Sequence, residues 1–174
     1  MNASASPFSR RTAMLLVAAG ALAFLLLLWL IGRGIAALHA SAAVSTAERD
    51  AVQALFAPTG STLWVTREGD LDAVTALSAS GPAYVFYFIE AMMQAGAEMG
   101  LTPDQSRRLA QETFAGAAAL AMQSDDPPAL LRERVTSKGG TTHAAISSLE
   151  GDGVKAAFVR ALHAARLRAE ELGR

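Results

Sequence analysis

The pattern of apolar positions divides the chain near residue 31. Residues 13–31 contain no charged and no strongly polar side chain. As a helix this segment spans about 28 Å, close to the ~30 Å hydrocarbon core of a bilayer. Arg10 and Arg11 precede it, and such charges favour an N-terminus kept in the cytoplasm. We therefore expect residues 1–12 to be a leader and residues 13–31 a transmembrane helix, which makes the chain a single-pass membrane protein.

Two other interpretations of this segment stay open. Ser9-Arg10-Arg11 followed by Leu15 and Leu16 faintly resembles a twin-arginine export signal, and Ala40-Ser41-Ala42 is a small-residue cleavage pattern. Alternatively, the abrupt change of character near Ile31 indicates a truncated or frameshifted gene that reads through unrelated sequence, and the protein is then cytoplasmic. Hydropathy favours the spanning helix.

Residues 32–69 have the pattern of a short strand–helix–strand unit. Apolar residues 35–40 predict a strand, and residues 47–56 predict a helix that Ser45 or Thr46 caps. Pro58 and Gly60 end this helix, and the β-branched and aromatic residues of 62–66 predict a second strand. Such a unit is short for an independent domain.

Residues 70–174 read as helix almost throughout, and we expect a bundle of about five helices. Pro82 suits the first position of a helix with Ser80 as its cap, and residues 83–99 are apolar nearly all round. Because so small a domain cannot bury such a helix on every side, a second subunit is its expected cover. The fold class is therefore mainly α, with the strand–helix–strand remnant in front of the bundle.

The following helices have clear sequence boundaries. Thr102 caps a helix that Pro103 opens, and Gln105 completes a capping box. The later part of this helix, residues 115–119, is made of alanine and glycine, which allow another helix to approach closely. Three more helices are expected from about residue 126 to before Ser137, over 141–151, and over a final segment with an apolar stripe at Val154, Phe158, Ala161, Leu162 and Ala165.

Composition excludes several function classes. Hydrophobic residues make up 52% of the chain but aromatic residues only 6%, which favours packed helices. The formal net charge is −1 and the basic residues are scattered, so nothing indicates nucleic acid binding. There is no cysteine, and His39, His143 and His163 lack metal-ligand spacing. We therefore expect no metal site.

The best candidate site is the segment Ser137-Lys138-Gly139-Gly140-Thr141-Thr142. Two glycines let the backbone turn tightly, and a helix that follows directly presents unpaired N–H groups and the positive end of its dipole. That arrangement suits a small anion such as a carboxylate. Without other evidence the pattern is also typical of an ordinary turn between two helices.

Two stretches resemble the pyrroline-5-carboxylate reductase family. Residues 71–84, which end in Gly81-Pro82-Ala83-Tyr84, look like the start of that family's dimerisation domain, and residues 135–142 are similar to its substrate loop. The resemblance runs from about residue 31 to the C-terminus. The chain departs from the family at Ala79, where glycine is usual, and at Lys138, where proline is usual.

The resemblance implies roles for individual residues. Ser137, Gly140 and Thr141 would hold the substrate carboxylate, with Gly139 in the same binding loop. Thr142 would be the catalytic residue, hydrogen-bonded to the ring nitrogen that gains a proton, and Asp125 stands where some members have a glutamate near the loop. The implied reaction is hydride transfer from NADPH or NADH to the C=N bond of 1-pyrroline-5-carboxylate, which gives L-proline.

The resemblance also implies a nucleotide-binding domain, most of which this sequence does not provide. Gly32-Arg33-Gly34 is a near match to a dinucleotide fingerprint, but no strand–turn–helix pattern surrounds it. We therefore assign no cofactor-binding residues. Three hypotheses remain: an incomplete reductase that is inactive alone, perhaps with a nucleotide domain from another chain; a non-catalytic, membrane-anchored module that oligomerises with itself or with a full-length reductase; or a truncated gene product.

Overall fold

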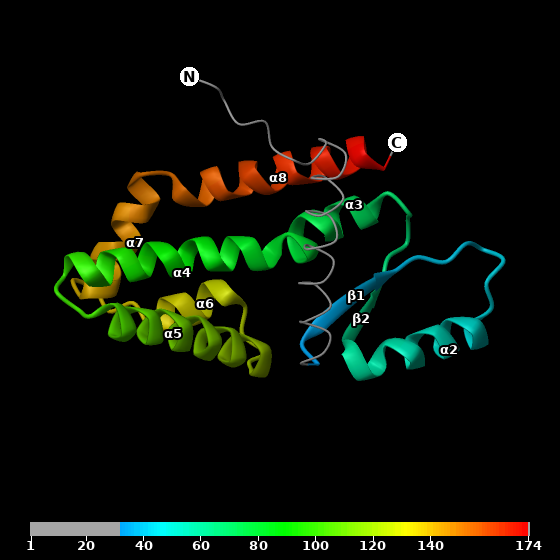
Figure 1. Ribbon diagram of the computed structural model, residues 1–174, viewed down its shortest axis with the longest axis horizontal. Helices are drawn as coiled ribbons and strands as arrows, with labels where there is room; N and C mark the ends of the chain where they lie inside the picture. Colours follow the sequence, from blue (N-terminus) through cyan, green and yellow to red (C-terminus); the bar gives the residue numbers. More distant parts are fainter. Residues whose placement is uncertain (1–31, 174) are drawn as a thin grey trace, which may run out of the picture. The chain divides into compact units, whose positions relative to one another are not determined.

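The computed structural model describes residues 32–173 (Figure 1). The leader and the transmembrane helix expected over residues 1–31 lie outside the described residues. Within residues 32–173, no helix has the length and apolar character needed to cross a membrane. The chain divides into two compact units between Ala79 and Ser80.

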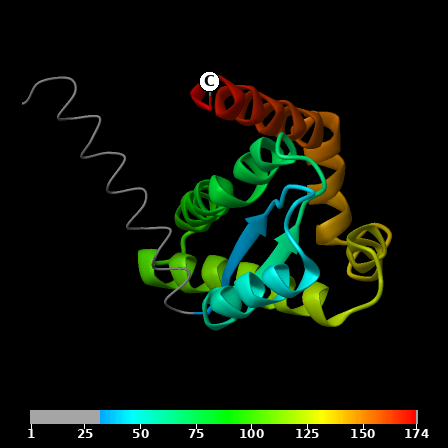
Figure 2. The same cartoon turned by 90° about the vertical axis from the view of Figure 1, so that its right-hand side faces the viewer.

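The first unit is built around two parallel strands joined by a helix. Strand β1 (Gly34–Leu38), helix α2 (Thr46–Phe56), a 3₁₀ turn (Ala57–Thr59) and strand β2 (Gly60–Trp64) follow in order. The strands pair from Gly34 opposite Gly60 to Leu38 opposite Trp64, and the predicted strand–helix–strand unit is confirmed (Figure 2). At the start of the ladder Gly60 has φ +140°, and a Cβ there would lie 1.9 Å from the Gly34 carbonyl oxygen, so only glycine fits.

Helix α2 begins at a capping box and covers one face of these strands. Ser45 Oγ accepts from the Glu48 N–H, and the Glu48 carboxylate accepts from the Ser45 N–H at 2.9 Å. Trp64 Nε1 donates to Gln53 Oε1 at 2.9 Å, and the guanidinium of Arg49 lies 5.5 Å from the Trp64 ring centroid. Helix α3 (Asp70–Val74) and a π-helical turn (Thr75–Ala79) complete the unit.

The second unit contains five helices in the described part of the chain, as predicted. They are α4 (Gly81–Glu98), α5 (Pro103–Gln123), α6 (Pro128–Arg134), α7 (Thr141–Gly151) and α8 (Val154–Leu172). The capping box at the start of α5 is confirmed: Thr102 Oγ1 accepts from the Gln105 N–H and the Gln105 amide accepts from the Thr102 N–H.

Two predicted helix starts differ from the structure. Ser80 stands at the N-cap of α4, but its side chain makes no capping bond. Its backbone is already helical because a π-helical turn leads into it, and the Ala83 N–H donates to the Ser80 carbonyl instead. The α6 helix begins at Pro128, later than expected, with Pro127 as its N-cap in extended backbone.

Packing within the second unit leaves much apolar surface uncovered. Helices α4 and α5 pair, and Phe158 of α8 meets Tyr84 and Phe88 of α4 edge-on at centroid distances of 5.8 and 5.6 Å. The buried apolar residues of residues 32–173 are three alanines, Ala36, Ala76 and Ala110. Large apolar side chains stay exposed on α4, α5 and α8, among them Val85, Met92, Leu109, Leu120, Val159 and Leu167.

Candidate anion-binding turn and the adjoining cleft

The turn between α6 and α7 is a type II β-turn over residues 137–140. The Gly140 N–H donates to the Ser137 carbonyl oxygen at 3.0 Å, and Gly139 has φ +75°. In the described chain only glycines have positive φ, so Lys138 occupies the second position with negative φ. This combination defines a type II turn, whose third position favours glycine and whose second position favours proline. The second position is where Lys138 replaces the usual family proline.

Gly140 ends this turn and caps α7. Its backbone is extended, with φ −80° and ψ 175°. A Cβ at this position would lie 2.5 Å from Ser137 Oγ and 3.2 Å from the Ser137 carbonyl oxygen. The absence of a side chain therefore lets Ser137 fold back over the start of the helix.

The first turn of α7 presents several donors. The first intrahelical bond runs from the Ala144 N–H to the Gly140 carbonyl, so the N–H groups of Thr141, Thr142 and His143 precede it. Gly140 supplies no side chain to accept from them, and the first turn contains no acidic residue. These donors, the helix dipole and the exposed Lys138 ammonium together make a cationic environment that favours an anion.

The structure brings most of the predicted site residues together. Ser137, Gly139, Gly140, Thr141 and Thr142 all lie on the turn or in the first turn of α7, with Thr142 half-buried and Ser137 and Thr141 exposed. Asp125 is exposed and makes no hydrogen bond or ion pair within residues 32–173. Its neighbour Asp126 instead pairs with Arg134 at the end of α6. The roles of these residues stay predictions.

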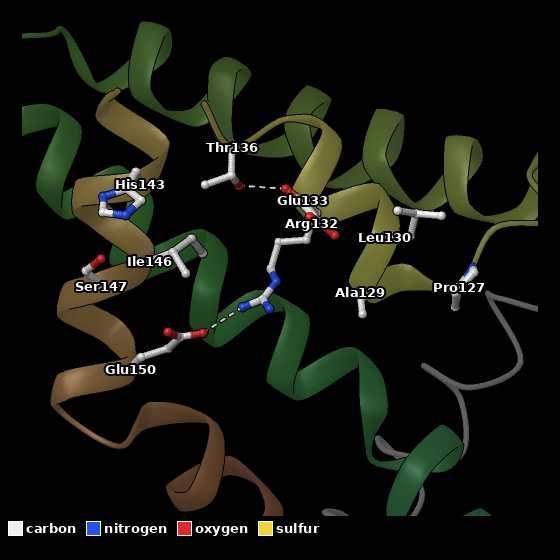
Figure 3. Close-up of a pocket in the computed structure, with 10 residues that line it drawn as sticks. All are labelled: Pro127, Ala129, Leu130, Arg132, Glu133, Thr136, His143, Ile146, Ser147 and Glu150. Carbon is white, nitrogen blue, oxygen red and sulfur yellow. Dashed lines mark hydrogen bonds and ion pairs between the residues drawn. The ribbon is translucent and has the colours of Figure 1, made fainter. Parts of the chain in front are cut away.

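A cleft of about 500 Å³ lies beside the turn, between α6 and α7 (Figure 3). Arg132 Nη1 of α6 donates to Glu150 Oε1 of α7 at 2.8 Å across it. Thr136 Oγ1 donates to the Arg132 carbonyl at 2.6 Å, which ties the chain before the turn to α6. The cleft is lined by Pro127, Ala129, Leu130, Arg132, Glu133, Thr136, His143, Ile146, Ser147 and Glu150.

Sequence reasoning did not identify this cleft, although one signal was available. His143, Ile146, Ser147 and Glu150 are spaced at i, i+3, i+4 and i+7 and so share one face of α7. The spacing does not predict which element faces these residues across the cleft. The structure shows that α6 does, with Arg132 bonded to Glu150. The Arg132–Glu150 pair is more than half exposed at both ends, so it contributes at most about 1 kcal/mol.

The helix that joins the two parallel strands does not fit a dinucleotide phosphate at its N-terminus. A dinucleotide phosphate group needs a free helix N-terminus after a glycine-rich turn. At α2, which joins the two parallel strands, the Glu48 carboxylate occupies that position, bonded to the Ser45 N–H and to Ser45 Oγ at 2.7 Å. These hydrogen bonds, that from the Ser45 side chain first, hold the pKa of Glu48 below its ordinary value. A fixed negative charge at this point disfavours a phosphate.

The helical unit and its glycine turn define a helical domain in which one helix N-terminus lacks a side-chain cap. The model of the family described as pyrroline-5-carboxylate reductase dimerisation matches residues 68–172, which is more than half of the chain. The chain therefore belongs to the pyrroline-5-carboxylate reductase family.

Individual relatives agree with this assignment. The chain is 44% identical to a pyrroline-5-carboxylate reductase of Pseudomonas aeruginosa over 143 residues, which cover 82% of this chain and 52% of the relative. It is 40% identical to that of Corynebacterium melassecola over 145 residues, which cover 83% and 53%.

Solved structures of the family have the same fold. The reductase of Coxiella burnetii superimposes with a TM-score of 0.76 at 36% identity, covering 79% of this chain and 51% of that chain. The Plasmodium falciparum reductase, solved with NADP bound, gives a TM-score of 0.71 at 30% identity, covering 79% and 57%. The chain thus spans about half the length of the relatives it matches.

Proposed function

We propose that this chain supplies the substrate-binding part of a pyrroline-5-carboxylate reductase. The observation that carries the proposal is the type II turn at Ser137–Gly140 directly before α7, because the N–H groups at that helix end precede its first intrahelical bond and receive no side-chain cap. A carboxylate on a small ring fits such donors. Ser137 and Thr141 add hydroxyl groups, and Gly139 and Gly140 allow the close approach.

Thr142 is the proposed catalytic residue. It lies in the first turn of α7, half-buried, beside the donors assigned to the carboxylate. If the turn fixes the carboxylate, the Thr142 hydroxyl is available to hydrogen-bond the ring nitrogen of 1-pyrroline-5-carboxylate. That bond would orient the C=N group and hold the nitrogen while it gains its proton.

The reduction needs NADPH or NADH, which supplies the hydride when bound. Because the N-terminus of α2 does not fit a dinucleotide phosphate, we expect another polypeptide segment to hold the nucleotide. We therefore expect the purified chain alone to reduce 1-pyrroline-5-carboxylate negligibly at saturating NADPH.

The test is ligand binding by the purified full chain in the absence of cofactor. L-proline should perturb the NMR amide signals of Thr141, Thr142 and His143. Thr142→Ala should still bind the carboxylate of L-proline but should lose the hydrogen bond to the ring nitrogen of L-proline. Ser137→Ala should weaken the binding of L-proline. Unperturbed signals at millimolar proline would contradict the assigned site. Robust turnover that Thr142→Ala abolishes would instead make this chain an enzyme in its own right.

The alternative function is a non-catalytic oligomerisation module, which pairs with itself or with a full-length reductase. The observation that favours it is the exposed apolar surface of α4, α5 and α8, together with a core of only three buried alanines in residues 32–173. We propose a homodimer or higher oligomer in either case. Light scattering should give at least a dimer at micromolar concentration, and proline binding at the turn distinguishes the two functions.

A membrane anchor over residues 13–31 also stays a proposal, supported by the length and the lack of charge of that segment. Carbonate extraction of membranes should leave the chain in the pellet. Recovery in the soluble fraction, or a mature N-terminus near Ala43, would contradict a retained anchor.

A further inference from the structure

The substrate turn connects two helices that face each other across an open cleft. The cleft between α6 and α7 measures about 500 Å³. Of the hydrogen bonds within residues 32–173, one joins these two helices, from Arg132 Nη1 to Glu150 Oε1 at 2.8 Å (Figure 3). This ion pair therefore bridges a gap that side-chain packing leaves open, and it restricts the angle between α6 and α7.

The groups assigned to the substrate carboxylate lie on both sides of the turn. Ser137 precedes the two glycines and follows α6, whereas Thr141 and Thr142 belong to α7. Gly139 has φ +75°, and a Cβ at Gly140 would lie 2.5 Å from Ser137 Oγ. The distance between the Ser137 hydroxyl and the free N–H groups of α7 therefore depends on the angle between the two helices.

The ion pair lies where it restricts that angle effectively. Glu150 is about 13 Å along α7 from Thr141, and a contact far from the turn limits rotation of the helix more than a contact beside it. On the other side of the cleft, Thr136 Oγ1 donates to the Arg132 carbonyl at 2.6 Å. The residue before Ser137 is thus bonded to the same residue that carries the guanidinium.

We propose that Arg132 and Glu150 are positioning residues for the substrate turn. Their ion pair holds α6 and α7 at the angle at which the Ser137 hydroxyl and the N–H groups of α7 bind one carboxylate together. The inference rests on the proposed function. Because the pair is exposed and an equilibrium shifts only by the difference in interaction energy, its loss should lower the population of the binding-competent angle by at most about fivefold.

The first experiment measures the affinity of the purified full chain for L-proline without cofactor, from the NMR amide signals of Thr141 and Thr142. Glu150→Gln should raise the dissociation constant about two- to fivefold. Glu171→Gln is the matched control, because it breaks an equally exposed ion pair within α8, from Arg168 Nη1 to Glu171 Oε2 at 2.7 Å. It should leave the dissociation constant unchanged, and circular dichroism checks that both variants keep their helices.

Exchange of the two charges separates positioning from the loss of a side chain. Arg132→Gln should weaken proline binding as much as Glu150→Gln, and the two together should weaken it no further, because the pair acts as a unit. Arg132→Glu combined with Glu150→Arg should return the dissociation constant to within about twofold of the wild type. If Glu150→Gln unfolds, Arg132→Gln and the exchanged pair provide the same comparison.

The second experiment follows the turn itself and needs no ligand. The Gly140 N–H donates to the Ser137 carbonyl at 3.0 Å, so its hydrogen exchange reports opening of the turn. Glu150→Gln should speed this exchange by up to about fivefold, and the exchanged pair should slow it again. The Leu101 N–H, which donates to the Gly96 carbonyl at 3.0 Å between α4 and α5, should exchange as before.

The two experiments distinguish the positioning role from the proposed function. Unchanged Gly140 exchange in a folded Glu150→Gln chain, an equal effect of Glu171→Gln, or an exchanged pair no better than the single variants would overturn the positioning role. Faster exchange with an unchanged dissociation constant, in a chain that binds proline, would overturn it as well. If the wild type binds no proline but Gly140 exchange responds as expected, the proposed function fails and the control of the turn by the ion pair stands.

Discussion

Gly96 of α4 lies directly against Ser106 of α5. A methyl group at Gly96 would meet Ser106 Oγ at 2.5 Å and Ser106 Cβ at 2.9 Å. Ser106 is 3% exposed, and its hydroxyl has no hydrogen-bond partner within residues 32–173. The close approach of the two helices at this contact thus depends on a glycine, and the contact contains an unpaired hydroxyl.

Gly96→Ala should destabilise the second unit. Overpacking costs about 1–3 kcal/mol, more than the ~1 kcal/mol that alanine gains over glycine in a helix. Chemical denaturation followed by circular dichroism measures the free energy of unfolding. Gly151→Ala, where nothing lies within 4 Å, is the control and should change it little. A Gly96→Ala variant as stable as the wild type would contradict a tight contact between Gly96 and Ser106. Adding Ser106→Gly to Gly96→Ala should restore part of the lost stability.

Lys138→Pro should stabilise the substrate turn. Proline suits the second position of a type II turn, and the restraint lowers the entropy of the unfolded chain by an amount worth about 0.4–1 kcal/mol. Thermal unfolding of the variant checks this. Lys138→Ala, which removes the charge without restraining φ, should leave stability within about 0.5 kcal/mol of the wild type. Equal stability of the proline and alanine variants would argue against the assigned turn type.

Gly116→Leu should weaken self-association. Nothing lies within 4 Å of a Cβ at Gly116, so the space at this position is open within one chain, and circular dichroism checks that the leucine variant keeps its helices. We expect a second subunit to pack against the alanine-glycine run, and a leucine should then raise the dimer dissociation constant by about tenfold or more. Sedimentation equilibrium measures it. Gln111→Leu, about 140° away around α5, should dimerise normally, and an unchanged constant for Gly116→Leu would place the interface elsewhere.

Glu48 should make the first unit sensitive to acid. Its pKa is lowered by the hydrogen bond from the Ser45 side chain and then by that from the Ser45 N–H. The resulting stabilisation is fully present above the unfolded carboxyl pKa of about 4.3 and is lost as the pH falls through the lowered folded value. NMR titration of the Glu48 carboxyl should give a midpoint below the ordinary one. Ser45→Ala should raise that midpoint, and Glu48→Gln should flatten the acid side of the stability curve; a Glu48 midpoint unaffected by Ser45→Ala would contradict this account.

Local signals account for what could be predicted along the chain. The capping box of Thr102 and Gln105 involves groups three residues apart, so its outcome depends little on the rest of the fold. The two glycines at 139 and 140 likewise permit the tight turn before α7, and residues 137–142 lie together on it. Ser80 shows the limit of such signals, because the π-helical turn before α4 replaced the expected cap.

The sequence by itself determined the order of the helices and strands, the turn residues and the resemblance to a reductase family. Only the tertiary structure decided which side chains meet across elements: Gly96 with Ser106, Arg132 with Glu150, and Trp64 with Gln53. The physical reason is range, since helix caps and turns depend on a few consecutive residues, whereas contacts between elements depend on how the whole chain packs.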